Sequence, residues 1–185
     1  MMPDTTSVID ATTTDGYLLV LVIVLPVLGI LLSLALGGKF IERITLALFL
    51  VGLCVAIAIF AAVLRSDQLV VYVVGNWQPP LGIALRADGI SAAMVLTIAV
   101  IVFAIGLYAR SEFGQQKGAA VTRSSYAFWT LLLGIWSGLN AVALGDDLFN
   151  LYVALELLTF AAVPLVCVKG YEATIKAAMR YMLFA

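Results

Sequence analysis

Glu156 is the residue of this sequence whose position most clearly suggests chemistry. It stands in the apolar run Leu148–Val166, about 12–13 Å along a helix and so near the middle of a ~30 Å hydrocarbon core. A charge at that depth costs at least about 2.5–3.5 kcal/mol, and a carboxyl group lowers this cost by holding a proton. A carboxyl whose proton occupancy responds to a neighbouring charge is a proton-transfer element. The alternative is an interhelical hydrogen bond that only holds a bundle together.

Two basic residues follow in the next segment. Lys176 and Arg180 are four residues apart and therefore share one face of a helix that begins near Glu172. Lys176 lies close to the helix start, where a basic side chain can reach the membrane surface and mark the cytoplasmic side. A role for Lys176 in proton transfer stays open beside that interpretation. Arg180 lies about 12 Å along the helix and is the better candidate for a buried cation.

Further acidic and aromatic residues could assist the glutamate. Asp146 and Asp147 precede its apolar run, where they would cap free helix amides or gather protons at an entrance. Asp88 fits the N-cap of another helix, with Arg86 alongside as a partner. Tyr152 precedes the glutamate by one turn and is expected on the same helix face.

Polar and proline residues within the apolar runs could shape the helices. Pro26 and Pro164 remove a backbone donor and can kink a membrane helix, so Pro164 could open a local water path near the glutamate. Asn140, Thr159 and Tyr152 could hydrogen-bond across helices.

The composition indicates which solvent surrounds these residues. Of 185 residues, 64% are hydrophobic and 11% are charged, whereas soluble domains have about 45–50% and about 25%. A soluble globule and a disordered chain are therefore excluded. The net charge of −1 offers no basic excess for nucleic-acid binding, and the absence of histidine excludes histidine-ligated metal or haem. We expect no cofactor, and we interpret Cys54 and Cys167 as small hydrophobic residues rather than a disulfide.

The apolar runs define the elements that must position the candidate residues. With about 20 residues for each membrane span, they predict helices at about 17–37, 43–64, 88–109, 124–144 and 148–168. A sixth helix begins near Glu172 and is still running at the last residue. Residues 68–86 hold two apolar or β-branched runs around a Gly/Asn/Pro turn, which predicts a β-hairpin. The fold class is an all-α polytopic membrane protein with about five full spans, a partial sixth and this hairpin.

The charges predict an orientation. Basic residues gather in the links after the first, third and fifth helices, and acidic residues gather in the tail (1–16) and in the other links. Positive residues mark the cytoplasmic side, so we expect an extracytoplasmic N-terminus and hairpin.

Three stretches of the sequence resemble a known family. They are GNWQPPLGIALRADGISAAMVL (75–96), GLNAVALGDDLFNLYVALELLTFAAVPLV (138–166) and KAAMRYMLFA (176–185). They resemble the antiporter-like proton channel family, which includes the large membrane subunits of complex I. The A-type and D-type subunits of Mrp-type multisubunit cation/proton antiporters and the membrane subunits of membrane-bound hydrogenases are further members. The chain looks most like the Mrp D-type subunit, over nearly everything after residue 17.

The resemblance implies proton translocation through charged residues across the bilayer midplane. Glu156 matches the family's glutamate, which works against a lysine. Where the family has Lys-Tyr in the sixth helix, this chain has Arg180-Tyr181. An arginine stays protonated, so it would hold Glu156 ionised rather than relay a proton. The implied function is a subunit of a multisubunit membrane ion-translocating complex that carries part of a proton pathway for cation/proton antiport through a buried glutamate, Glu156. No catalytic chemistry of its own is expected.

Two alternatives to antiport stay open. The chain could be a proton-pumping subunit of a complex I-like or membrane-bound hydrogenase complex, or a truncated structural or assembly subunit without transport of its own. The coupled ion, among protons alone, sodium and potassium, also stays open.

The resemblance also implies partners and a location. Family members have two inverted five-helix repeats, and this chain corresponds to the first of them, residues 17–185 being the N-terminal part of such a domain. We therefore expect other membrane subunits, including a chain that supplies the second repeat, in a bacterial or archaeal-type cell membrane. No nucleic acid is expected as a partner.

Overall fold

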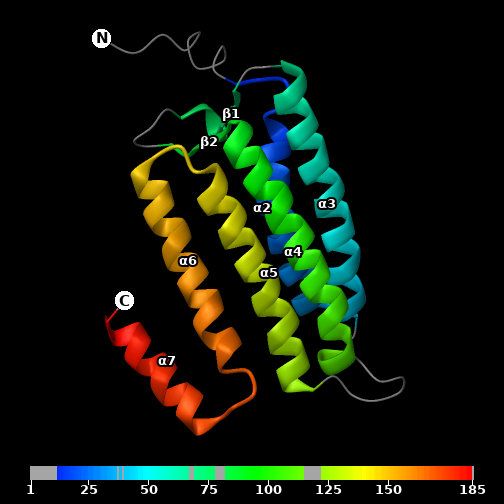
Figure 1. The fold of residues 1–185 in the computed structure, drawn as a ribbon, viewed down its shortest axis with the longest axis vertical. Helices are drawn as coiled ribbons and strands as arrows, with labels where there is room; N and C mark the ends of the chain where they lie inside the picture. The colour runs from blue at the N-terminus through cyan, green and yellow to red at the C-terminus, as the bar shows by residue number, and fades with distance from the viewer. Residues whose placement is uncertain are drawn as a thin grey trace.

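The computed structural model describes residues 12–36, 38, 40–66, 69–77, 82–114 and 122–184. Within them, six long helices and a two-stranded hairpin follow one another along the chain (Figure 1). They are α2 (Tyr17–Ala35), α3 (Ile41–Ser66), β1 (Val70–Val73), the 3-10 turn η1 (Val74–Asn76), β2 (Ala84–Ala87), α4 (Gly89–Phe113), α5 (Arg123–Leu144), α6 (Leu148–Val166) and α7 (Glu172–Phe184). The predicted fold class is confirmed. Most of the predicted tail (1–16) and the Pro-rich tip of the hairpin lie outside the described residues.

Helices α2 to α6 are each long and apolar enough to cross a membrane. A helix satisfies its own backbone polar groups, which is why an apolar run in lipid adopts this structure. The chain is therefore a multi-pass membrane protein. Many large apolar side chains point outward from the bundle, as expected where lipid or another protein is the solvent. The largest fully buried side chains include Trp129, Trp136, Phe49, Leu19, Ile59 and Leu133.

Helix α5 lies at the centre of the bundle, against α2, α4 and α6 (Figure 1). Its Trp136 is 1% exposed and packs edge-on against Phe49 of α3, with ring centroids 5.2 Å apart. The indole fits because α3 has glycine at residue 52. A Cβ atom on Gly52 would lie 2.2 Å from Cζ2 of Trp136.

Side chains of α5 also donate hydrogen bonds to α2 at the turn where its proline removes a backbone donor. Pro26 has no N–H, so the carbonyl of Val22 lacks the donor four residues ahead. The side-chain amide of Asn140 donates to that carbonyl at 3.0 Å, and the hydroxyl of Ser137 donates to the carbonyl of Ile23 at 3.1 Å. The cross-helix hydrogen bond predicted for Asn140 is confirmed, and it ties α5 to the kink-prone turn of α2.

The hairpin caps one end of the bundle, which we call the hairpin end. Strands β1 and β2 pair antiparallel, with Val70 opposite Ala87. Leu85 of β2 forms a further bridge to Gly145, in the turn between α5 and α6. The hairpin therefore holds the turn from which α6 starts.

The opposite end of the bundle carries two ion pairs between helices. Arg110 Nε lies 3.0 Å from Glu42 Oε1, which joins α4 to α3. Lys169 Nζ lies 2.5 Å from Glu112 Oε1, which joins the α6–α7 turn to α4, and the Glu112 carboxylate raises the pKa of Lys169. Basic residues gather at this end as predicted, although Lys39 and Lys117 lie outside the described residues.

Candidate functional site

Glu156 lies near the middle of α6, on the face turned away from α5. The face toward α5 carries the two buried residues of α6, Ala154 and Ala161. At about 100° per residue, Glu156 stands about 200° around the helix from Ala154. Its side chain is exposed. The prediction of a buried glutamate is therefore wrong for the described residues, because depth along a helix does not decide which helix face another helix covers.

Small residues decide which face of α6 meets α5. Gly134 and Gly138 form a G-x-x-x-G pair on α5, a spacing that lets two membrane helices approach closely. A Cβ atom on Gly138 would lie 3.3 Å from the Cα atom of Leu158, and one on Gly134 would lie 3.2 Å from the Cβ atom of Ala161. This glycine spacing is a signal that the sequence analysis missed, and it could have predicted that the opposite face carries Glu156.

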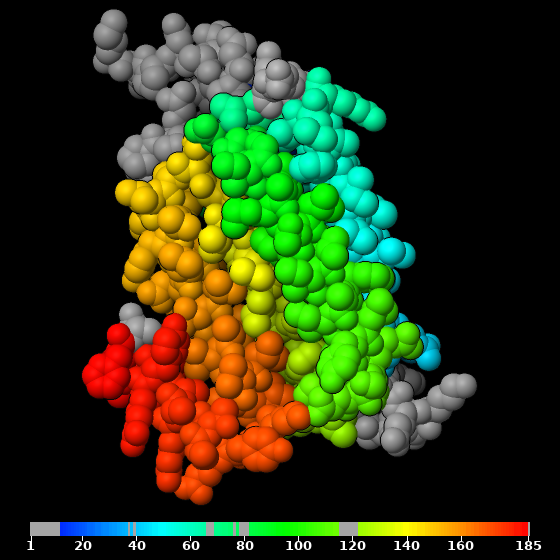
Figure 2. Space-filling view, in the orientation of Figure 1, coloured from blue at the N-terminus to red at the C-terminus, as the bar shows by residue number. Residues whose placement is uncertain are grey.

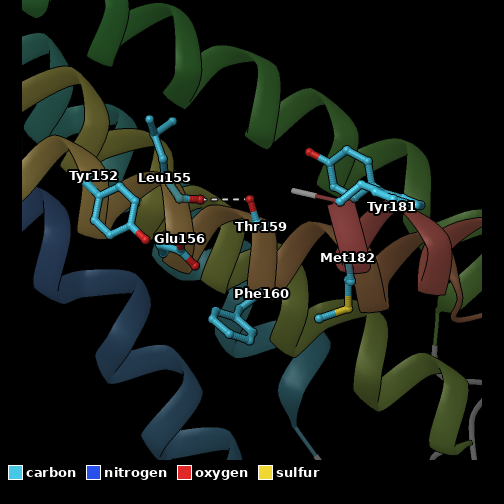
Figure 3. Close-up of a pocket in the computed structure, with 8 residues that line it drawn as sticks. Tyr152, Leu155, Glu156, Thr159, Phe160, Tyr181 and Met182 are labelled. Carbon is cyan, nitrogen blue, oxygen red and sulfur yellow. Dashed lines mark hydrogen bonds between the residues drawn. The ribbon is translucent and has the colours of Figure 1, made fainter.

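A cavity of about 650 Å³ lies between α6 and α7, and Glu156 faces it (Figure 3). The hydroxyl group of Tyr152 points toward the Glu156 carboxylate, so the shared face predicted for these two residues is confirmed. Helix α7 contributes Tyr181, Met182 and Phe184 to the other wall. Figure 2 shows α7 at the edge of the molecule, against the lower part of α6.

Two further residues of α6 affect the hydrogen bonding of the helix near this cavity. Pro164 cannot donate to the carbonyl of Phe160, four residues before it, and Phe160 lines the cavity. The hydroxyl of Thr159 donates to the carbonyl of Leu155 at 3.0 Å. The cross-helix bond predicted for Thr159 is therefore wrong, since the bond stays within α6. The Glu156 carboxylate and the Tyr152 phenol on one wall form a surface that can hold water.

The basic residues of α7 do not meet Glu156. Lys176 Nζ lies 2.6 Å from Glu172 Oε1, one turn back on the same helix, and both side chains are exposed. Arg180 is exposed and forms no ion pair in the part of the chain that the structure describes. Neither residue lines the cavity, because the face of α7 toward α6 is formed by other residues. These are Thr174, Ala177, Ala178 and Tyr181.

Two of the predicted aspartates cap helices. The backbone N–H of Asn150 donates to Asp147 at 2.8 Å, and the Asn150 side-chain amide donates to the other carboxylate oxygen. The backbone N–H of Ser91 donates to Asp88 at 2.7 Å, and this bond lowers the pKa of Asp88 below its usual value. The predicted capping roles of Asp147 and Asp88 are confirmed.

Asp146 takes a different role at the hairpin end. It lies 3.5 Å from Arg86 of β2, and its backbone N–H donates to the carbonyl of Ala84 at 3.4 Å. Arg86 therefore forms its ion pair with Asp146, because the hairpin carries it to the α5–α6 turn, and its charge also contributes to the lowered pKa of Asp88. A local sequence pattern does not predict an ion pair whose two residues lie in separate elements. Glu156 follows Asp146 by ten residues, which corresponds to a rise of about 15 Å along a helix, so the two carboxylates do not touch.

The fold and this site define a multi-pass α-helical membrane protein with a carboxyl side chain at mid-depth of a span. No family model matches the sequence. Several known proteins are nevertheless similar to the sequence. The D-type subunit of a Na⁺/H⁺ antiporter of Bacillus subtilis is 32% identical over 110 residues, which cover 60% of this chain and 21% of that protein. The N-type subunit of an NADH-quinone oxidoreductase of Desulforudis audaxviator is 29% identical over 176 residues, which cover 91% of this chain and 33% of that protein.

A solved structure shares the fold. A chain of the Mrp complex from Dietzia sp. DQ12-45-1b superposes with a TM-score of 0.76 at 22% identity, over 92% of this chain and 31% of that one. The chain is thus a homologue of the D-type subunits of Mrp antiporters and the N-type subunits of complex I, as the sequence resemblance indicated. It spans a third or less of the length of the relatives described here.

Proposed function

We propose that the chain is a subunit of a multisubunit membrane complex that translocates ions, and that Glu156 carries part of its proton pathway for cation/proton antiport. The observation that carries this proposal is the Glu156 carboxylate itself, halfway along a span and facing a cavity beside the Tyr152 hydroxyl. A carboxyl group there can exchange protons with water in the cavity. The similarity to a component of a Na⁺/H⁺ antiporter supports antiport as the coupled process.

In this proposal the basic residues of α7 bias the proton occupancy of Glu156 from a distance. Lys176 and Arg180 stand on the far side of α7, roughly 10 Å away if one helix diameter separates them from the carboxylate. A positive charge that approaches a carboxylate favours its ionised form, and one that withdraws favours proton uptake. A movement of α7 that carries these charges toward or away from the carboxylate is the coupling step in this proposal.

The acidic residues at the hairpin end act, in this proposal, as an entrance. Asp88 and Asp147 already accept the hydrogen bonds of their helix caps. Asp146 is exposed and holds only a 3.5 Å pair with Arg86, so it is the residue most available to gather protons from water. Tyr152 stands between this end and Glu156 on the same helix, and its hydroxyl group points toward the Glu156 carboxylate.

Neighbouring membrane subunits complete the pathway in this proposal. Apart from the α7 residues that wall the cavity, no described residue covers the face of α6 that carries Glu156, and this helix exposes large apolar side chains. Leu148, Phe149, Leu157 and Phe160 are all exposed. A partner that supplies further spans, including the second repeat, would cover this face and exclude water from its outer side.

The same uncovered face favours a second candidate function, a structural or assembly subunit that joins larger membrane subunits without transport. The similarity to a component of an NADH-quinone oxidoreductase favours a third, proton pumping driven by redox chemistry in partner subunits. Transport assays with sodium, potassium or no added cation, and with a quinone reductant, separate the three.

The deciding experiment compares Glu156→Gln, Glu156→Asp and Glu172→Gln in the assembled complex, reconstituted in liposomes with a pH-sensitive dye inside. Glu172 is the control, because it is an exposed carboxylate on the neighbouring helix. We expect Glu156→Gln to abolish proton-coupled transport with assembly intact, Glu156→Asp to keep a part, and Glu172→Gln to keep nearly all. Normal transport by Glu156→Gln, together with loss of assembly when the chain is removed, would establish the structural function instead.

A further inference from the structure

A second cavity lies far from Glu156, at the hairpin end between the start of α2 and the end of α3. Its volume is about 600 Å³. Helix α3 contributes one continuous face to it, since Cys54, Ile57, Ala58, Ala61 and Arg65 recur at spacings of three and four. The alanines leave room between the larger side chains of Ile57 and Leu18, so the cavity is a groove that follows the helix.

The groove is charged at one end only. Asp15, just before α2, and Arg65, at the end of α3, both line it and both are exposed. Neither forms an ion pair with any other residue that the structure describes. From Arg65 to Cys54 the groove runs about 16 Å along the helix, which is half of a ~30 Å hydrocarbon core. Its charged end therefore stands at headgroup level and its apolar end reaches toward the middle of the bilayer.

We propose that this groove binds a phospholipid with a zwitterionic headgroup and a primary amine, of the phosphatidylethanolamine type. The Arg65 guanidinium matches a phosphate, which it can bind with two parallel hydrogen bonds. The Asp15 carboxylate accepts hydrogen bonds from the primary ammonium group. One acyl chain lies along Ile57, Ala58 and Cys54. Tyr17, also in the lining, places an amphipathic ring at the membrane boundary.

The pair of charges selects among the common bilayer lipids. A phosphatidylcholine offers the same phosphate to Arg65, but its quaternary ammonium has no N–H to donate to Asp15. A phosphatidylglycerol offers no cation at all. The expected preference is therefore ethanolamine over choline and glycerol. Both halves of that preference depend on Asp15, whereas Arg65 binds the phosphate that the three lipids share.

The test is native mass spectrometry of the purified full chain in detergent, with equal amounts of the three lipids added. We expect retention of the ethanolamine lipid about tenfold above the other two, the value of one charge-assisted hydrogen bond. Arg65→Gln should lower retention of all three lipids. Asp15→Asn should remove the advantage of ethanolamine over both choline and glycerol. Arg123→Gln, an exposed arginine at the opposite end, should change nothing.

Filling the groove provides an independent test. Ala58→Leu narrows it, and Ala104→Leu makes the same change at an exposed position of α4 as the control. With an ethanolamine lipid that carries a photoreactive acyl chain, we expect crosslinks to the α3 peptide that contains Cys54. Ala58→Leu should lower them about tenfold and Ala104→Leu should not. Equal retention of ethanolamine and choline lipids by the native chain, or unchanged crosslinking in Ala58→Leu, would overturn the proposal.

Discussion

The hydrogen bond from Asn140 to Val22 makes a sharp prediction about how α2 and α5 are held together. Asn140 is fully buried, and its side-chain amide donates a hydrogen bond to the carbonyl that Pro26 leaves without a backbone donor. Asn140→Leu keeps the branching of the side chain but leaves that carbonyl unpaired in an apolar interior. An unpaired buried acceptor costs about 1–3 kcal/mol, and measured bonds between membrane helices reach about 1.7 kcal/mol. We therefore expect a loss of about 1–2 kcal/mol of unfolding free energy.

A second substitution tests whether this reason is the right one. Pro26→Ala restores a backbone N–H that can donate to the carbonyl of Val22, so Asn140→Leu should cost less in that background. The expected coupling free energy is about 1 kcal/mol. Thermal unfolding in detergent, followed by tryptophan fluorescence, would show it as about 2–4 °C of non-additivity in Tm. If Asn140→Leu lowers Tm equally in both backgrounds, the amide does not compensate for the proline and our reasoning about this contact is refuted.

Three other predictions concern single contacts. Gly52→Ala should destabilise the bundle by about 1–3 kcal/mol, because its Cβ would lie 2.2 Å from the Trp136 ring; an unchanged Tm would contradict this packing. The Glu112 carboxylate raises the pKa of Lys169 above 10.5, so the Tm advantage of the native chain over Glu112→Gln should be full below that pH and shrink as the pH rises further. Asp88→Ala should cost about 1 kcal/mol at neutral pH, and the difference should disappear as the pH falls well below 3.8, where the native carboxylate also loses its charge.

Membrane helices were predictable because lipid imposes a simple length rule. The run predicted at about 17–37 is α2 (Tyr17–Ala35), and the hairpin predicted at 68–86 pairs Val70–Val73 with Ala84–Ala87. Local chemistry was predictable for a related reason, since an N-cap such as Asp147 depends only on the next few residues. The sequence-based orientation is a prediction that the helix arrangement does not test.

Contacts between helices were harder to predict because a membrane span is apolar all round. The face of α6 that meets α5 is set by Ala154 and Ala161 against the glycines of α5, and those small residues leave Glu156 on the uncovered side. Arg86 forms its ion pair with Asp146, sixty residues along the chain, because the hairpin folds over the α5–α6 turn. The position of a charged residue in the sequence predicts its depth in the membrane. The residue that it pairs with depends on how the helices and the hairpin pack together.

The central claim is that the Glu156 carboxyl group binds and releases a proton within the membrane. Infrared difference spectroscopy of the reconstituted complex measures this directly, because a protonated carboxyl group in an apolar environment has its own C=O stretching band. We predict a band that rises and falls as the pH is stepped across the working range, that is absent in Glu156→Gln, and that persists in Glu172→Gln. A band that survives unchanged in Glu156→Gln, or no pH-dependent carboxyl band in the native complex, would contradict the account.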